Sequence, residues 1–341
     1  SSADINAAPI VLPNTLNASA SILIDAVTYN GRKTGNVLLN TDLSGGELTL
    51  QFSGLLPGET EVSVSGLAAS QEGELTFEGD SQLYIGNART LGEWLGADLS
   101  PISKGVLKNI KSSVNIKASQ KEIQLSKINT QFDKSKLSGA ATIALRKRLG
   151  LGISLSLDRI NLNSYLPKTP ASKTSEITTQ SSTQTQTESQ SQTQALTTNI
   201  NPLASLGFLT KIDANTKLRI GELVHSGIKV RKITLDTTLF KNNLTFNDVR
   251  VDDLAGAKIS VTGALSKLNA MPQFDNLKVD FKTKSIAALA KILKLDLPIP
   301  AKTIGKVSLN AGLNGAILQP TLSTKIGAIG ATVTLDGKLS A

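Results

Sequence analysis

The sequence predicts an all-β protein: an elongated, curled antiparallel sheet that forms a gutter or taco-like groove, with a few short capping helices. Three observations lead to this fold class. Most of the chain alternates apolar and polar residues with a period of two. Hydrophobic residues make up 40% of the chain but aromatic residues only 4%, which favours a repetitive sheet over a compact core built on bulky anchors. Only three short segments have a helical pattern.

The predicted strands fall into two groups, and Gly, Asn, Asp, Ser or Lys bound each strand. Short turns between alternating segments are typical of an antiparallel meander. The first group comprises residues 18–27, 46–55, 60–67, 73–86, 112–119, 121–133, 135–145 and 151–162. The second comprises residues 216–223, 228–239, 243–254, 257–265, 273–283, 305–315 and 330–339.

The three predicted helices each follow a strand and open with Asn or Ser, which are preferred helix N-caps. They are expected at residues 87–96, 161–166 and 285–295. Trp94 in the first is expected to be a core residue, with a plug at the end of the groove as the alternative. The third carries Ile286, Leu289, Ile292 and Leu293 and is expected to pack on the edge of the sheet as a cap.

A segment of extreme composition divides the chain. Between Thr174 and Gln194 almost every residue is Ser, Thr or Gln, so this stretch cannot bury enough apolar surface to offset its ordering entropy. We therefore predict a sheet unit at residues 1–167, a disordered linker at 168–201 and a second sheet unit at 202–341. Because closing a long flexible loop costs little more than closing a short one, the two units could still form one continuous sheet.

The alternation places a set of apolar side chains on one face of the second unit, opposite Lys, Arg, Thr, Asp and Asn. A sheet with one apolar face must cover it, and the sequence supplies little to cover it with. The predicted groove residues are Leu218, Ile220, Ile228, Val230, Ile233, Leu235, Leu244, Phe246, Val249, Val251, Ile259 and Val261. Without further information, a closed β-sandwich core stays open as the alternative.

Composition and charge exclude several function classes. The chain has no Cys and a single His, His225, so thiolate and His-rich metal sites are not expected. It offers no grouping of acid, base and nucleophile, so we expect neither an enzyme nor a cofactor. The formal charge is +9, but the one dense basic run, Arg146-Lys147-Arg148, has no interleaved aromatic residues, which argues against nucleic acid. This run is a candidate contact for lipid head groups, or simply a solvated hairpin end.

Three passages carry a family resemblance. They are "LSLDRINLNSYLP" (155–167), the segment 203–266 with "GIKVRKITLDTTL" and "AGAKISVTG", and "LKVDFKTKSIAALAKIL" (277–293). This order of strands, turns and linker resembles the C-terminal region of the AsmA family of Gram-negative envelope proteins. The match covers about residues 155–295, and residues 17–154 look like a preceding unit of the same kind, more loosely.

The resemblance implies a periplasmic protein held at the inner membrane by an N-terminal helix that this sequence lacks, and we expect the chain to be a fragment of a longer protein. It implies a non-enzymatic role in which phospholipid acyl chains lie in an apolar β-groove and outer-membrane lipid homeostasis is supported. A physical argument agrees: moving two acyl chains through water costs on the order of 20 kcal/mol, which an apolar trough would largely remove. The alternative is a structural β-scaffold or adhesin-like surface protein that binds no lipid.

Overall fold

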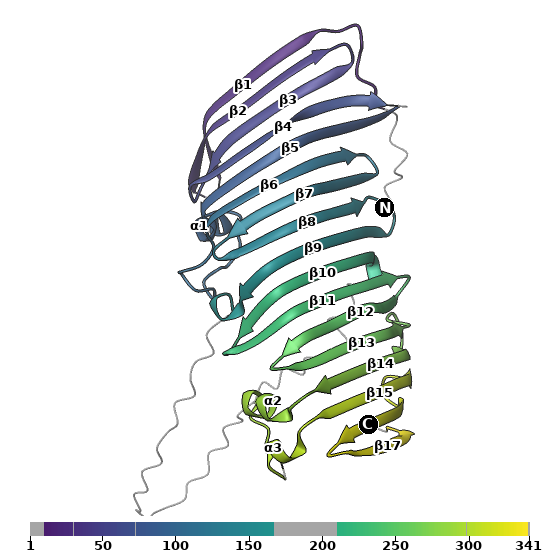
Figure 1. Cartoon of the computed structure of the whole chain (residues 1–341). Coiled ribbons are helices and arrows are strands. Elements are labelled where there is room, and N and C mark those ends of the chain that lie inside the picture. Colours follow the sequence, from purple (N-terminus) through teal and green to yellow (C-terminus); the bar gives the residue numbers. More distant parts are fainter. Residues whose placement is uncertain (1–9, 30, 72, 167–209, 298, 340–341) are drawn as a thin grey trace, which may run out of the picture.

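The computed structural model describes residues 10–29, 31–71, 73–166, 210–297 and 299–339. It confirms the predicted all-β class, because these residues form one curled sheet of 17 strands that does not close into a barrel (Figure 1). The predicted linker at 168–201 lies outside the described residues. The division into two units stays a prediction, although the strands on either side of the linker pair directly.

The strands follow one another across the sheet in chain order. The first nine are β1 (Ala18–Tyr29), β2 (Arg32–Ser44), β3 (Glu47–Leu56), β4 (Thr60–Gln71), β5 (Glu74–Asn87), β6 (Lys108–Ser119), β7 (Glu122–Phe132), β8 (Ser135–Ala144) and β9 (Leu149–Asn161). The remaining eight are β10 (Ile212–His225), β11 (Ile228–Phe240), β12 (Asn243–Leu254), β13 (Ala257–Ser266), β14 (Gln273–Thr283), β15 (Val307–Ala316), β16 (Thr321–Ala328) and β17 (Ala331–Lys338).

Neighbouring strands pair in an antiparallel manner with one exception. The strands β9 and β10 are parallel, with Leu155 opposite Leu218 and Leu157 opposite Ile220. The sheet is therefore mixed, which the prediction of a purely antiparallel sheet did not include. A parallel pair cannot be joined by a tight turn and needs a long connection, and the Ser/Thr/Gln-rich stretch falls within the connection between these two strands.

Two strands were missed by the sequence interpretation. In β2 the run Val37-Leu38-Leu39 breaks the alternation, and Asn36 has a positive φ of 50° beside a shift in the pairing with β3. In β16 a threonine, Thr324, stands between Leu322 and Ile326, which weakens the apolar pattern. Both strands nevertheless pair with their neighbours over most of their length.

The short helices lie along one side of the sheet, where strands end, and we call this row of strand ends the helix edge (Figure 1). The row of strand ends on the opposite side is the hairpin edge. The elements α1 (Ala88–Trp94), the single-turn η1 (Leu162–Ser164) and α2 (Ile286–Leu293) confirm the three predicted segments. The side chains of Asn87 and Asn161 accept N-capping hydrogen bonds, whereas Ser285 occupies the N-cap of α2 without one. The four-residue α3 (Ala301–Ile304) was not predicted.

Candidate functional site: the apolar face of the sheet

The apolar side chains of successive strands line up into rows that cross the sheet. Residues directly opposite each other on paired strands point to the same face, so the strand registers define these rows. One row, from β9 to β17, is Leu157, Ile220, Ile233, Val251, Ile259, Phe281, Leu309, Ile326 and Val333. The next is Leu155, Leu218, Leu235, Val249, Val261, Val279, Ala311, Thr324 and Leu335.

All twelve predicted groove residues lie on this face. Eight of them belong to the two rows just described, over β10 to β13. Ile228 and Val230 lie nearer the helix edge, and Leu244 and Phe246 nearer the hairpin edge. The uneven spacing of Phe246 and Val249 is accommodated by a shift in register between them, which keeps both on the apolar face.

None of the twelve is sealed in a closed core. Each is half-buried, whereas the polar side chains between them, such as Lys217, Arg219, Lys229 and Arg231, are exposed. Val333 and Leu335 at the end of the two rows are 52% and 54% exposed. Among the described residues, the apolar face is thus an open surface rather than the interior of a sandwich, and the sandwich alternative is not what the structure shows.

The same face continues across the first half of the sheet, where it carries more polar side chains. Ile22, Leu39, Phe52 and Val64 form a cross-strand series from β1 to β4. Farther along, hydroxyl side chains are mixed with apolar ones on the same face: Ser81 on β5 lies opposite Val114 on β6. Ser112 on β6 lies opposite Leu83 on one side and Thr130 on the other. The Ser112 and Thr130 hydroxyl oxygens lie 2.8 Å apart and hydrogen-bond to each other, which lowers the cost of placing them there. The sequence interpretation did not identify this polar stretch.

A helical cap covers the helix-edge end of the apolar face near the C-terminus. Ile286 and Leu289 of α2 pack on Ala257, which is fully buried. Around this cluster gather Leu254, Ala255, Phe281, Leu297, Ala301, Ile304 and Val307. Of the four predicted cap residues, Ile286 and Leu289 therefore do pack on the sheet, Ile292 is half-buried outside this cluster, and Leu293 is 45% exposed.

A second cap, α1, lies at the same edge farther toward the N-terminus. The Trp94 indole N–H donates a 2.9 Å hydrogen bond to the Tyr29 carbonyl, and the two rings meet edge-to-face at 5.5 Å. Tyr29 ends β1 whereas α1 follows β5, so this contact joins strands that are four positions apart in the sheet. The expectation that Trp94 is a core residue is wrong, because its side chain is only half-buried and no residue of α1 is buried.

The hairpin edge carries less cover. The backbone N–H of Leu12 donates to the Ser70 hydroxyl, which in turn donates to the Ile10 carbonyl, so residues 10–12 cross the end of β4. Farther along, the loop between β13 and β14 buries Leu268, whose N–H donates to the Asn242 carbonyl. The apolar face is thus flanked by chain segments at both edges and open between them.

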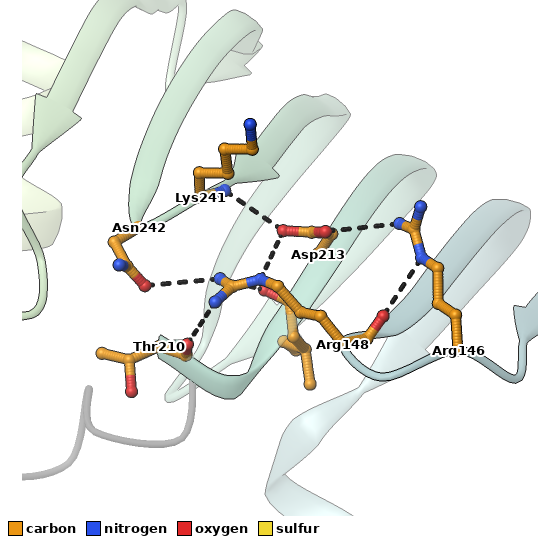
Figure 2. A network of polar contacts seen from close by, with 7 residues as sticks. Arg146, Arg148, Thr210, Asp213, Lys241 and Asn242 are labelled. Carbon is orange, nitrogen blue, oxygen red and sulfur yellow. Dashed lines mark hydrogen bonds and ion pairs between the residues drawn. The ribbon is translucent and has the colours of Figure 1, made fainter. Parts of the chain in front are cut away.

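At the hairpin edge a polar cluster joins β9 and β10, the two strands that pair in parallel (Figure 2). The Arg148 guanidinium pairs with Asp213 at 2.6 Å and donates to the carbonyls of Thr210 and Ile212. Arg146 pairs with the other oxygen of Asp213 at 3.3 Å, and the Lys241 backbone N–H also donates to that carboxylate. We call this group of residues the junction clasp.

The electrostatics of the clasp centre on Asp213, which is 8% exposed. Burial disfavours the charged carboxylate, but the hydrogen bond from the Lys241 N–H and the charges of Arg148 and Arg146 outweigh it. The pKa of Asp213 is therefore held below its usual range. Of the three predicted head-group contacts, Arg146 and Arg148 are engaged in this clasp, and Lys147 between them is exposed.

The opposite face of the sheet is polar. In the second half it carries ion pairs across strands, such as Arg231 with Glu222 at 3.0 Å and with Asp253 at 3.2 Å. In the first half it carries many hydroxyl and amide side chains, and a shallow hollow of about 1010 Å³ lies there. This hollow is lined by residues that include Ser53, Ser63, Gln82, Tyr84, Ser113, Asn129 and Gln131. The sequence interpretation did not foresee it.

The part of the chain that the structure describes contains neither a membrane-spanning helix nor a metal-binding cluster. No helix among the described residues is long and apolar enough to cross a membrane. Within the same residues, no group of three or more His, Cys, Asp or Glu side chains could hold a metal ion. Comparison with protein-family models, curated proteins and solved structures found no match to this chain.

Proposed function

We propose that this chain binds phospholipid acyl chains along its apolar face as a non-enzymatic lipid-holding or lipid-transfer segment. The observation that carries the proposal is the pair of rows that run from β9 to β17 and are apolar apart from Thr324. Most of their side chains stay partly exposed, and Leu157 and Thr324 are the two buried members. Contiguous apolar surface of this extent is rare on a soluble monomer and marks an interaction site. An acyl chain would remove it from water without any chemical step.

The dimensions suit such a ligand. Strands in a sheet lie about 4.8 Å apart, so 17 of them extend roughly 75 Å. The hydrocarbon thickness of one membrane leaflet is about 15 Å, so several lipids could lie along the face. Each methylene transferred from water contributes about 0.8 kcal/mol. Head groups would remain at the open edges, where charged side chains and water are available.

The AsmA-like assignment, the periplasmic location and the membrane anchor are part of the same proposal. They are supported by the sequence resemblance over residues 155–295 and by the long open sheet. The role in outer-membrane lipid homeostasis follows from that resemblance. In this reading the protein works with phospholipid as its partner and uses no cofactor, catalytic residue or nucleic acid.

A second candidate function is a structural β-scaffold or adhesin-like protein without lipid. The hollow of about 1010 Å³ on the polar face favours it, because the lining hydroxyl and amide groups are suited to a polar ligand. The scaffold function leaves the half-exposed apolar rows without a role, whereas lipid binding accounts for them. We therefore place lipid binding first.

The deciding experiment is native mass spectrometry of the purified chain, followed by lipid extraction from the same sample. Phospholipid in stoichiometric amounts is the expected result. If the chain is lipid-free, incubation with phosphatidylethanolamine and phosphatidylglycerol vesicles and re-isolation should load it. A chain that stays lipid-free after this loading step contradicts the proposal and leaves the scaffold function ahead.

A further inference from the structure

The cap formed by α2, α3 and their flanking turns, residues 284–306, combines positive charge with exposed apolar side chains. We call it the basic cap. It contains five lysines, which are all exposed, and one acidic residue, Asp296. The lysines are Lys284, Lys291, Lys294, Lys302 and Lys306. In Figure 1 the two helices stand at the ends of β14 and β15, at the edge of the sheet.

Large apolar side chains are exposed within the same segment. Leu293, Leu295 and Ile299 are 45%, 47% and 39% exposed. The helix α2 ends at Leu293, and its C-cap residue Lys294 adopts the left-handed conformation at φ 52°. Leu293 and Leu295 flank this residue. Of the other large apolar side chains of α2, Ile286 and Leu289 belong to the core cluster and Ile292 is half-buried. The cap is thus anchored to the sheet by one set of apolar residues and presents another to solvent.

The other cap offers a comparison within the same molecule. Residues 88–107, which contain α1, carry Arg89 and Lys104 against Glu93 and Asp98, so their charges balance. Leu95 in this segment is 64% exposed, but it has no excess of lysines around it. Exposed aliphatic side chains and an excess of lysines therefore occur together in the basic cap but not in the α1 cap.

We propose that the basic cap docks on the surface of a membrane that contains anionic lipids. Lysines near an anionic head-group layer gain electrostatic energy, while aliphatic side chains insert at the boundary between head groups and acyl chains. A protein partner would have to supply both an acidic surface and an apolar one, whereas an anionic bilayer surface supplies both by nature. Docking here would bring the apolar face of the sheet next to the bilayer, because the core of the cap packs on that face at Ala257.

This inference does not depend on the proposed lipid cargo, since a chain with an empty apolar face could still dock. Vesicle flotation tests it with the whole chain. Vesicles of phosphatidylglycerol and phosphatidylethanolamine are compared with vesicles of phosphatidylcholine, at low and at high salt. Binding is expected to the anionic vesicles only, and it should weaken at least tenfold as salt screens the lysines.

Two variants locate the binding surface. Replacing Lys291, Lys294 and Lys302 together with glutamine should weaken binding at least tenfold. A matched control replaces Lys229, Lys258 and Lys278, exposed lysines of the polar face, and should leave binding within twofold. Equal weakening by both triple variants would show that the overall charge of +9 is responsible, and this result would overturn the proposal, as would binding to neutral vesicles of equal strength.

The apolar contribution is tested in the same assay. Replacing Leu295 and Ile299 with asparagine should weaken anionic-vesicle binding several-fold, whereas Leu318→Asn at the hairpin edge, where Leu318 is 53% exposed, should not. Lipid cargo is measured by native mass spectrometry on every variant. Loss of docking with cargo retained supports the basic cap, and loss of cargo with docking retained counts only against the proposed function. Failure of the wild-type chain to bind anionic vesicles refutes the docking proposal.

Discussion

Replacing Ile233 and Leu235 together with asparagine tests whether the apolar face is open. Full burial of an Ile or Leu side chain is worth about 1.5–3 kcal/mol. Both side chains are half-buried, so we expect the double variant to lose only about 2–4 kcal/mol of unfolding free energy. In a closed core, each change would combine the loss of apolar contacts, about 2–5 kcal/mol, with the burial of an unsatisfied amide, about 1–3 kcal/mol.

The two cases are separated by urea unfolding and by lipid content. With an open face, the double variant stays folded, shifts its urea midpoint moderately and loses its lipid, because two adjacent rows become polar at β11. In a closed core the cost approaches the total stability of a typical domain, about 5–15 kcal/mol, and the variant would unfold. The control replaces Lys229 and Thr234, on the other face of the same strand, and should change neither quantity. A folded double variant that retains its full lipid content would refute the assignment of these rows to the ligand.

Three further predictions concern the clasp, the α1 cap and two glycines. Because the pKa of Asp213 is lowered in the folded chain, its contribution to stability is complete above its unfolded pKa of about 3.9 and is lost as the pH falls through the lower folded value. Asp213→Asn should remove that part of the acid sensitivity in urea unfolding measured from pH 6 to pH 2, and an unchanged pH profile would contradict it. Trp94→Phe removes the hydrogen bond to the Tyr29 carbonyl and should cost about 1 kcal/mol, with faster hydrogen exchange at the end of β1; unchanged exchange would count against this contact. A Cβ at Gly66 would lie 2.6 Å from the Phe77 ring and 2.7 Å from Gly79 Cα, so Gly66→Ala should cost about 1–3 kcal/mol, whereas Gly337→Ala, which meets nothing within 4 Å, should be neutral in the same unfolding assay.

The fold class could be predicted because the period-two alternation is a local property of each strand. The three helices were found for the same reason, since Asn or Ser followed by a short helical pattern is a local signal. The strand β2 was missed because the run Val37-Leu38-Leu39 crosses an irregular position at Asn36. The parallel pairing of β9 and β10 could not be predicted at all, because nothing within either strand specifies the direction of its neighbour.

The candidate site could be predicted only in part, because the alternation pattern describes each strand separately. Alternation identifies which side chains share a face within one strand, so it grouped twelve residues that the strand registers place on one face. Their role in a lipid groove stays a prediction. Alternation does not identify what lies opposite these residues on the next strand. The hydroxyl groups of Ser112 and Thr130 therefore went unnoticed until the registers of β6 and β7 brought them together. The roles of Arg146 and Arg148 depend on Asp213, more than sixty positions away in the chain.

The junction clasp explains how the apolar rows can run without a break through the parallel pair. In a hairpin the tight turn fixes the register, and a slip by one residue would turn every side chain to the opposite face. The strands β9 and β10 have no such turn, so their register needs another determinant. Arg148 supplies one, because it holds both the Asp213 carboxylate and the Ile212 carbonyl at the start of β10. With Gly150 opposite Asp213, Leu155 falls opposite Leu218 and Leu157 opposite Ile220. The basic run at the hairpin edge thus supports the apolar face indirectly, because it fixes the register between β9 and β10, where the two halves of the sheet meet.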